Sequence, residues 1–219
     1  AMNETRQLGG GYSDSNPIPF PTVNAVLSAV KPGSASSTLV VISGPPGVGK
    51  STLAHHMLDL VPGSLVVDKD CFAAPFILEL AQQTGTSAEN AYGTDLYWKR
   101  LRPIEYSGAV AIASANLVNS RTVFLVGGWG PELGIQDFWI SWKNKISPAA
   151  LIVIHLDPPE IEKWRTRMAI RGSRTDSPWF ESFCESVGNL PVWKHAVRIA
   201  SDCLPHEIVE QTLASIQQD

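Results

Sequence analysis

The stretch Gly44-Pro45-Pro46-Gly47-Val48-Gly49-Lys50-Ser51 indicates the fold class of this chain, because it fits the pattern G-x-x-x-x-G-K-[ST] at every position. Glycines in such a loop let successive backbone N–H groups point at phosphate oxygens. Lys50 adds a charge for the β- and γ-phosphates, and Ser51 adds a hydroxyl ligand for Mg²⁺. The sequence therefore predicts a nucleoside triphosphate site with ATP and Mg²⁺ as cofactors. The expected nucleotide-binding residues are Gly44, Pro45, Pro46, Gly47, Val48, Gly49, Lys50, Ser51 and Thr52.

The flanks of this loop predict a strand followed by a helix. Thr38–Ser43 is an unbroken apolar run, which is typical of a strand covered on both faces, and Lys50–Val61 carries an apolar stripe at helical spacing. We expect further strands at Leu65–Val67, Thr122–Val126, Ala150–Ile154 and Val197–Ile199. Helices are expected at Val23–Val30, Phe72–Gln83, Ala91–Asn119 with a new helix starting at Pro103, after Asp157-Pro158-Pro159-Glu160, and at Pro205–Gln217. The alternation predicts an α/β fold of the P-loop NTPase class, nucleoside-kinase-like, with a five-stranded parallel sheet and helices on both faces.

Length and composition limit the possible functions. The 219 residues suffice for one domain, expected at residues 31–219 after a mobile leader and short helix at residues 1–30. A net charge of −4 argues against binding long nucleic acid, and no stretch is apolar enough to span a membrane. The three cysteines show no C-x-x-C spacing, so we expect free thiols and a cytoplasmic location. The sequence does not predict an oligomeric state.

Two aspartates follow the second predicted strand, in Val67-Asp68-Lys69-Asp70. The carboxyl end of this strand is expected beside the phosphate loop, where open α/β sheets bind ligands. We expect Asp70 to act as the general base toward an attacking hydroxyl, and Asp68 to join Ser51 at Mg²⁺. The alternative is a polar turn in which Asp70 caps the next helix.

Aromatic residues are frequent around the predicted crevice. Ligand pockets are mostly apolar with a few polar groups, so these residues favour a moderately hydrophobic organic alcohol as acceptor, although most aromatic side chains are expected in the core. Trp129 is the strongest candidate because glycines flank it on both sides. The expected acceptor-pocket residues are Asp68, Phe72, Phe76, Trp98 and Trp129.

The phosphate loop, the Val67–Asp70 segment followed by Pro75-Phe76, the arginines after Asp157-Pro158-Pro159-Glu160 and the final strand–helix pair together resemble the small stand-alone P-loop kinases. This group contains chloramphenicol phosphotransferase-like and zeta-toxin-like proteins, often described as AAA-family ATP-binding proteins. The resemblance implies ATP-dependent phosphorylation of a small-molecule hydroxyl, with Asp70 in the place of the base. One departure is that no acidic residue follows the third strand directly, where the chain reads Val126-Gly127-Gly128-Trp129-Gly130, so Asp68 becomes the substitute metal-side carboxylate.

The arginines after Glu160 predict a lid. Arg167 and Arg171 are four residues apart and share a helical face, from which they could stabilise a transferring phosphoryl group. Arg165 is expected to stack on the adenine, as its counterpart does in lid-bearing kinases, and the glycine-containing 171–176 stretch is expected to form the lid tip. The alternative is a solvated basic face paired with Glu160 and Glu162.

The sequence favours a kinase that phosphorylates a small organic molecule, with natural products and antibiotics among the candidate acceptors. A nucleotide-sugar kinase or a polynucleotide 5′-hydroxyl kinase is the alternative within phosphotransfer, and a nucleotide-dependent switch or ATPase is the alternative outside it. GTP remains open as the donor, because the expected base-reading stretch near Ser201–Pro205 has no decisive pattern. A measurement of ATP turnover with and without candidate acceptors distinguishes a kinase from a switch or ATPase.

Overall fold

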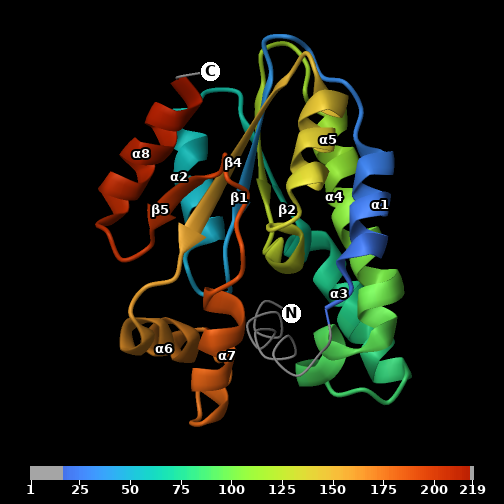
Figure 1. Ribbon diagram of the computed structural model, residues 1–219, viewed down its shortest axis with the longest axis vertical. Coiled ribbons are helices and arrows are strands. Elements are labelled where there is room, and N and C mark those ends of the chain that lie inside the picture. The colour runs from blue at the N-terminus through green and yellow to red at the C-terminus, as the bar shows by residue number, and fades with distance from the viewer. Residues whose placement is uncertain (1–16, 218–219) are drawn as a thin grey trace.

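A five-stranded parallel sheet forms the centre of the molecule, which we describe from a computed structural model for residues 17–217 (Figure 1). Its spatial order is β2-β3-β1-β4-β5, and every neighbouring pair is parallel. The strands are β1 (Thr38–Ser43), β2 (Leu65–Asp68), β3 (Thr122–Val126), β4 (Ala150–Asp157) and β5 (Val197–Ala200). The predicted α/β class and the five parallel strands are therefore confirmed.

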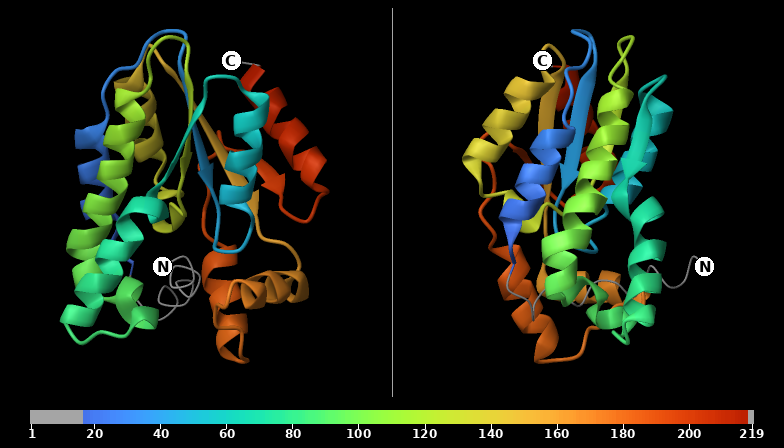
Figure 2. Two further views of the ribbon diagram at one scale, coloured as in Figure 1. Left: turned by 180° about the vertical axis from the view of Figure 1, so that it is seen from behind. Right: turned by 90° about the vertical axis from the view of Figure 1, so that its right-hand side faces the viewer.

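Helices cover both faces of the sheet. The α-helices are α1 (Pro19–Ala29), α2 (Lys50–Leu60), α3 (Lys69–Gln83), α4 (Arg102–Ala115), α5 (Gln136–Ile146), α6 (Ile161–Ile170), α7 (Trp179–Gly188) and α8 (Pro205–Gln217). Short helical turns are η2 (Ala88–Gly93), η3 (Tyr97–Leu101) and η4 (Gly130–Glu132). Helices α1, α4 and α5 lie on one face and α2 and α8 on the other (Figures 1 and 2).

Alternate side chains of each strand enter two separate cores. In β1, Leu39 and Val41 pack with α1, α4 and α5, whereas Val40 and Ile42 pack with α2 and the partly buried side of α8. Both faces of a parallel sheet are buried, so its strands need apolar residues at every position. This requirement explains why the strands read as continuous apolar runs in the sequence.

Several element predictions need correction. The stretch expected to be helical from Ala91 to Asn119 consists of the short turns η2 and η3 and of α4, which begins at Arg102 and ends at Ala115. The helix expected at Val23–Val30 is α1, and its Val23 and Val26 belong to the main core, so a boundary at residue 31 does not separate it from the domain. Helices α5 and α7 were not predicted. Asp157 is the last residue of β4 and pairs with Arg198 at 2.7 Å; the N-cap of α6 is Glu160 instead. The leader expected in residues 1–16 lies outside the described residues.

Two groups of helices extend beyond the carboxyl ends of the strands. Helices α6 and α7 lie on the β4–β5 side, and α3 with the lower part of α4 lies on the other side (Figure 1). The carboxyl edge between them is where β1 leads into the phosphate loop and β2 into α3. Within residues 17–217, no helix is both long and apolar enough to cross a membrane.

Candidate active site

The phosphate loop has the backbone conformation that its glycines allow. Gly44, Gly47 and Gly49 have φ values of 137°, 82° and 97°, in the region that L side chains rarely adopt. At Gly47 space is also limiting, because a Cβ there would lie 2.8 Å from Sδ of Met168 in α6. The loop therefore requires glycine both for its own shape and for its contact with α6.

A cavity of about 1180 Å³ opens in front of this loop and is lined by all the residues from Gly44 to Thr52. Other elements bring Asp70, Arg167 and Arg171 to the same cavity. The structure thus brings together the predicted phosphate loop, the predicted base and two of the three predicted lid arginines.

Lys50 and Arg171 supply positive charge to the cavity. The Nζ atom of Lys50 donates a hydrogen bond to the Pro45 carbonyl at 2.8 Å. Burial, and then the nearby charge of Arg171, lower the pKa of Lys50 to about 7. Within the described part of the chain, the Arg171 guanidinium has no hydrogen bond or ion pair, so it can bind an anion without first losing a partner.

Asp68 and Ser51 form the pair that fits Mg²⁺. The Ser51 hydroxyl donates to Oδ2 of Asp68 at 2.7 Å, although β2 and α2 are separate elements. Mg²⁺ in phosphate sites is held by one or two carboxylates and hydroxyls together with phosphate oxygens, so this donor set suits it. Asp68 is the register partner of Val126, the last residue of β3, which places a carboxylate beside the strand that lacks one of its own.

Asp68 also caps α3, since its Oδ1 accepts from the backbone N–H of Asp70 at 3.1 Å. The alternative reading in which Asp70 is the cap does not hold. The Asp70 side chain is 56% exposed and opens into the cavity, where its Oδ1 accepts from Nζ of Lys69 at 2.6 Å. Desolvation of the carboxylate within the cavity raises the pKa of Asp70, but the charge and hydrogen bond of Lys69, followed by the charges of Lys50 and Arg171, outweigh it and hold the pKa below its ordinary value.

Sequence reasoning missed a set of buried charged side chains behind Asp70. Lys69 bridges Asp70 and Glu105, with a distance of 2.8 Å from its Nζ to Oε1 of Glu105. Burial raises the pKa of Glu105, and the charge of Lys69 opposes this shift. Arg102 and Glu132 form a second pair at 2.6 Å, and both side chains are fully buried. The available signal was that Arg102 and Glu105 stand three residues apart among apolar residues, on the buried face of α4.

His155 was also missed as a cavity residue. It is the register partner of Ser43, and its Nδ1 lies 3.2 Å from the Ser43 hydroxyl. Burial lowers the pKa of His155 to about 4, against the attraction of Asp157. The imidazole is therefore neutral at pH 7 and supports the base of the phosphate loop as a polar, uncharged group.

The arginines of α6 divide into two roles. Arg167 donates from Nη2 to the Ser201 carbonyl at 2.8 Å, beside the stretch expected to read the base. Arg165 does not line the cavity: it pairs with Glu181 at 2.7 Å and lies 4.6 Å from the Phe180 ring, so it joins α6 to α7. The predicted stacking of Arg165 on adenine is therefore not supported.

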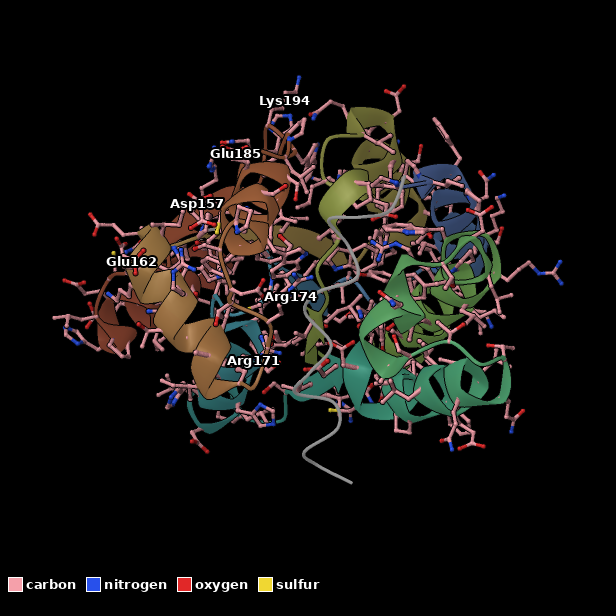
Figure 3. All side chains as sticks on the ribbon, turned by 90° about the horizontal axis from the view of Figure 1, so that it is seen from below. Asp157, Glu162, Arg171, Arg174, Glu185 and Lys194 are labelled. Atoms are coloured by element: carbon pink, nitrogen blue, oxygen red, sulfur yellow. The ribbon has the colours of Figure 1, made fainter. Side chains whose placement is uncertain are left out.

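The charges of the α6–α7 unit face different sides. Figure 3 shows Arg171 and Arg174 on the side turned toward the middle of the molecule, with Glu162 on the outer side. Arg174 pairs with Asp176 at 2.6 Å and lies 4.9 Å from the Trp179 ring. The alternative prediction of a solvated basic face paired with acidic residues therefore applies to the side of α6 that carries Glu162, and it does not apply to Arg171.

None of the four aromatic residues expected in the acceptor pocket lines the cavity. Trp98 and Trp129 are each 1% exposed and belong to core clusters, Phe72 packs against the core, and Phe76 is 77% exposed. Trp129 has φ 57°, which turns its ring back onto Tyr106 at 4.5 Å instead of into the crevice. The aromatic and apolar side chains that do line this part of the cavity are Tyr92, Pro131, Leu133, Val187 and Leu190.

No protein-family model and no curated protein matches the chain. Among solved structures, a gluconokinase from Sinorhizobium meliloti 1021 superposes with a TM-score of 0.53 at 16% identity, covering 83% of this chain and 92% of that chain. A sugar kinase from Janibacter sp. HTCC2649 gives a TM-score of 0.50 at 19% identity, with coverages of 83% and 95%. A tunicamycin resistance protein from Deinococcus radiodurans gives 0.52 at 16% identity, with coverages of 82% and 95%. The chain thus has the fold of small P-loop kinases.

Proposed function

We propose that this chain transfers the γ-phosphoryl group of ATP to a hydroxyl of a small organic molecule, with Asp70 as the general base. The observation that carries the proposal is that the Asp70 carboxylate opens into the cavity lined by Lys50 and the whole phosphate loop. The fold comparison supports it, since the similar structures include a gluconokinase and a sugar kinase. A natural product or antibiotic is one acceptor class within the proposal, in line with the similarity to a tunicamycin resistance protein.

In this reaction the phosphate loop binds the phosphates through its backbone N–H groups, and Lys50 and Arg171 neutralise their charge. Ser51 and Asp68 would hold Mg²⁺. When bound, the ion supplies a divalent charge that offsets the negative charge of the phosphates. Arg167 lies beside Ser201 and borders the nucleoside end of the cavity.

The acceptor enters on the side of Asp70. The carboxylate takes the proton of the acceptor hydroxyl while that oxygen forms a bond to the γ-phosphorus, and the bond from phosphorus to the β–γ bridging oxygen breaks. The products are a phosphorylated acceptor and ADP, with the proton on Asp70 until it returns to water. Lys69 keeps Asp70 ionised at neutral pH, so the carboxylate is ready to accept the proton.

The test measures ADP formation with ATP alone and with a panel of acceptors, together with mass spectrometry for a gain of one phosphate. The panel holds hydrophobic alcohols, sugars, nucleotide sugars and 5′-hydroxyl oligonucleotides. We expect Asp70→Asn to lower kcat by about 10²-fold with nucleotide affinity unchanged, as for a lost general base. Asp59→Asn, an exposed change on α2, is the matched control and is expected to have no effect.

Full-rate hydrolysis of ATP without any acceptor would overturn the kinase proposal and favour an ATPase or switch. If only nucleotide sugars or oligonucleotide ends are phosphorylated, the proposed acceptor, a small organic molecule, is wrong and that other class takes its place. Equal losses for Asp68→Asn and Asp70→Asn in kcat and in metal dependence would contradict the separate roles given to these two residues.

The compartment and the partner classes follow from composition. The described cysteines Cys71, Cys184 and Cys203 are free thiols, which is typical of a reducing compartment, and we place the protein in the cytoplasm on that basis. The net charge of −4 supports a small molecule as the partner in preference to long nucleic acid.

A further inference from the structure

A continuous row of hydrogen-bonded side chains leads from the cavity into the protein behind Asp70. Its members are Asp70, Lys69, Glu105, Tyr97, Arg102 and Glu132. Lys69 donates to Asp70 at 2.6 Å and to Glu105 at 2.8 Å, and the Tyr97 hydroxyl donates to the other oxygen of Glu105 at 2.9 Å. Arg102 donates to the Tyr97 oxygen at 3.3 Å and forms a two-pronged contact with Glu132 at 2.6 and 3.1 Å.

Four of these side chains are charged and almost fully buried. The exposed fractions are 6% for Lys69, 1% for Glu105, and 0% for Arg102 and Glu132. Two cations and two anions balance, so the extra charge of the row is the Asp70 carboxylate at its cavity end. Apolar side chains of similar volume would stabilise a protein core as well or better, so stability alone gives a poor reason for burying these ions.

The two ends of the row belong to segments that line the cavity. Asp70 opens into it directly, and Glu132 belongs to η4, whose Gly130 and Pro131, with the following Leu133, line it. Lys69 and Asp70 begin α3, and Glu105 and Arg102 belong to the first turn of α4. The row therefore joins the segment that carries the base to the turn that forms an apolar part of the cavity wall.

We propose that Lys69 and Glu105 are positioning residues that fix the Asp70 carboxylate relative to the η4 wall, and so relative to the acceptor hydroxyl. The proposal rests on the proposed function, because it assumes that Asp70 is the base. Lys69 can hold Asp70 in one place only if its own ammonium is fixed, and Glu105 fixes it because Tyr97 occupies the second oxygen of that carboxylate. A displacement of about 1 Å at a reacting group can cost about 10²-fold in rate.

The test compares Lys69→Met, which leaves Glu105 buried without its cation, with the double variant Lys69→Met/Glu105→Gln, which removes both charges. We expect both to lower kcat by about 10- to 10²-fold, with the KM for ATP within about twofold of the wild type. The double variant should regain thermal stability relative to the single variant but not kcat. Lys99→Met is the matched control, because Lys99 forms an exposed pair with Asp95 at 2.6 Å and is not a member of this row.

Recovery of kcat together with stability in the double variant would show that the row serves folding only, and would overturn the proposal. In protein that already carries Asp70→Asn, the same changes should cause no further loss of kcat, because the row acts through Asp70. If the losses of kcat multiply instead, Lys69 contacts the substrate itself, and the positioning role is contradicted. Each outcome thus supports or contradicts a positioning role.

Crystal structures of the variants supply a readout that does not depend on phosphotransfer. In Lys69→Met/Glu105→Gln we expect the Asp70 carboxylate to move by about 1 Å or to take two conformations, and an unchanged Asp70 would overturn the inference. If wild-type protein shows no acceptor-dependent turnover, the proposed function fails, and the position of Asp70 in these structures still decides whether Lys69 and Glu105 hold it.

Discussion

Among single residues, the cavity combines cations that repel each other with two carboxylates that have different partners. Burial, and then the nearby charge of Arg171, lower the pKa of Lys50 to about 7, so the site carries unfavourable repulsion that a polyphosphate would relieve. Asp70 is held ionised by Lys69, and Asp68 is engaged by Ser51 and the start of α3. Two carboxylates two positions apart thus have different partners and are expected to have different tasks.

Lys50→Ala removes the charge closest to the phosphates and is expected to lower turnover by about 10²- to 10³-fold, the range found for a lost electrostatic contact in a transition state. Steady-state ADP formation measures the effect. Lys143→Ala, an exposed change on α5, is the control and should retain full activity. Retention of more than about a tenth of the activity by Lys50→Ala would contradict its charge role.

At the scale of elements, α6 and α7 act as one unit. Trp164 and Met168 of α6 form a buried cluster with Phe180 and Phe183 of α7, and Arg165 adds the ion pair to Glu181. Arg167 and Arg171 project from the same helix toward the cavity. One helix therefore carries arginines for two purposes, one for its own attachment and two for the site.

We expect Arg171→Ala to lower kcat by about 10- to 10²-fold with the thermal midpoint unchanged, because this side chain has no described partner to lose. Arg165→Ala is expected to lower the thermal midpoint and to affect kcat less, since it breaks the α6–α7 contact and removes nothing from the cavity. Thermal unfolding and steady-state kinetics on both variants check this. A loss of kcat in Arg165→Ala with an unchanged thermal midpoint would instead support the predicted stacking of Arg165 on the adenine.

The sequence predicted the strands because a buried parallel strand needs an unbroken apolar run, and β1 and β3 match the expected ranges. It predicted the phosphate loop because the loop's chemistry is local. Helix α5 went unpredicted although Phe138, Trp139, Trp142 and Ile146 follow helical spacing, since no side-chain cap marks its start. The aromatic pocket residues were misplaced because ring direction depends on tertiary packing and on a single positive φ at Trp129, neither of which the local pattern reveals.

At the scale of the whole molecule, the site depends on neighbouring strands of the sheet being in register. β1 supplies the loop, β4 supplies His155 opposite Ser43, and β2 supplies Asp68 at the height of Val126. The neutral His155 of β4, beside Ser43 of β1, is a part of this arrangement that responds to acid. Protonation of His155 is expected to change the free energy of unfolding of the entire domain.

His155 has a folded-state pKa of about 4, below its ordinary value of 6.5, so between these values the unfolded chain binds more protons than the folded protein. The free energy of unfolding should therefore fall as the pH falls from 6.5 to about 4, by about 2–3 kcal/mol from this residue. Urea unfolding across this range measures the slope. His155→Asn should flatten it and the exposed His206→Asn should leave it unchanged; equal slopes in all three proteins would contradict the assignment.

The contact between α6 and the phosphate loop constrains how this enzyme-like cavity can admit its ligands. The Trp164 indole N–H donates to the Pro46 carbonyl at 2.7 Å, and Met168 lies against Gly47. An outward swing of the whole helix would break both contacts at once, whereas a rotation about an axis through Trp164 and Met168 would keep them. Arg171 follows Trp164 by about two helical turns, so such a rotation would carry its guanidinium along an arc around the anion-binding backbone.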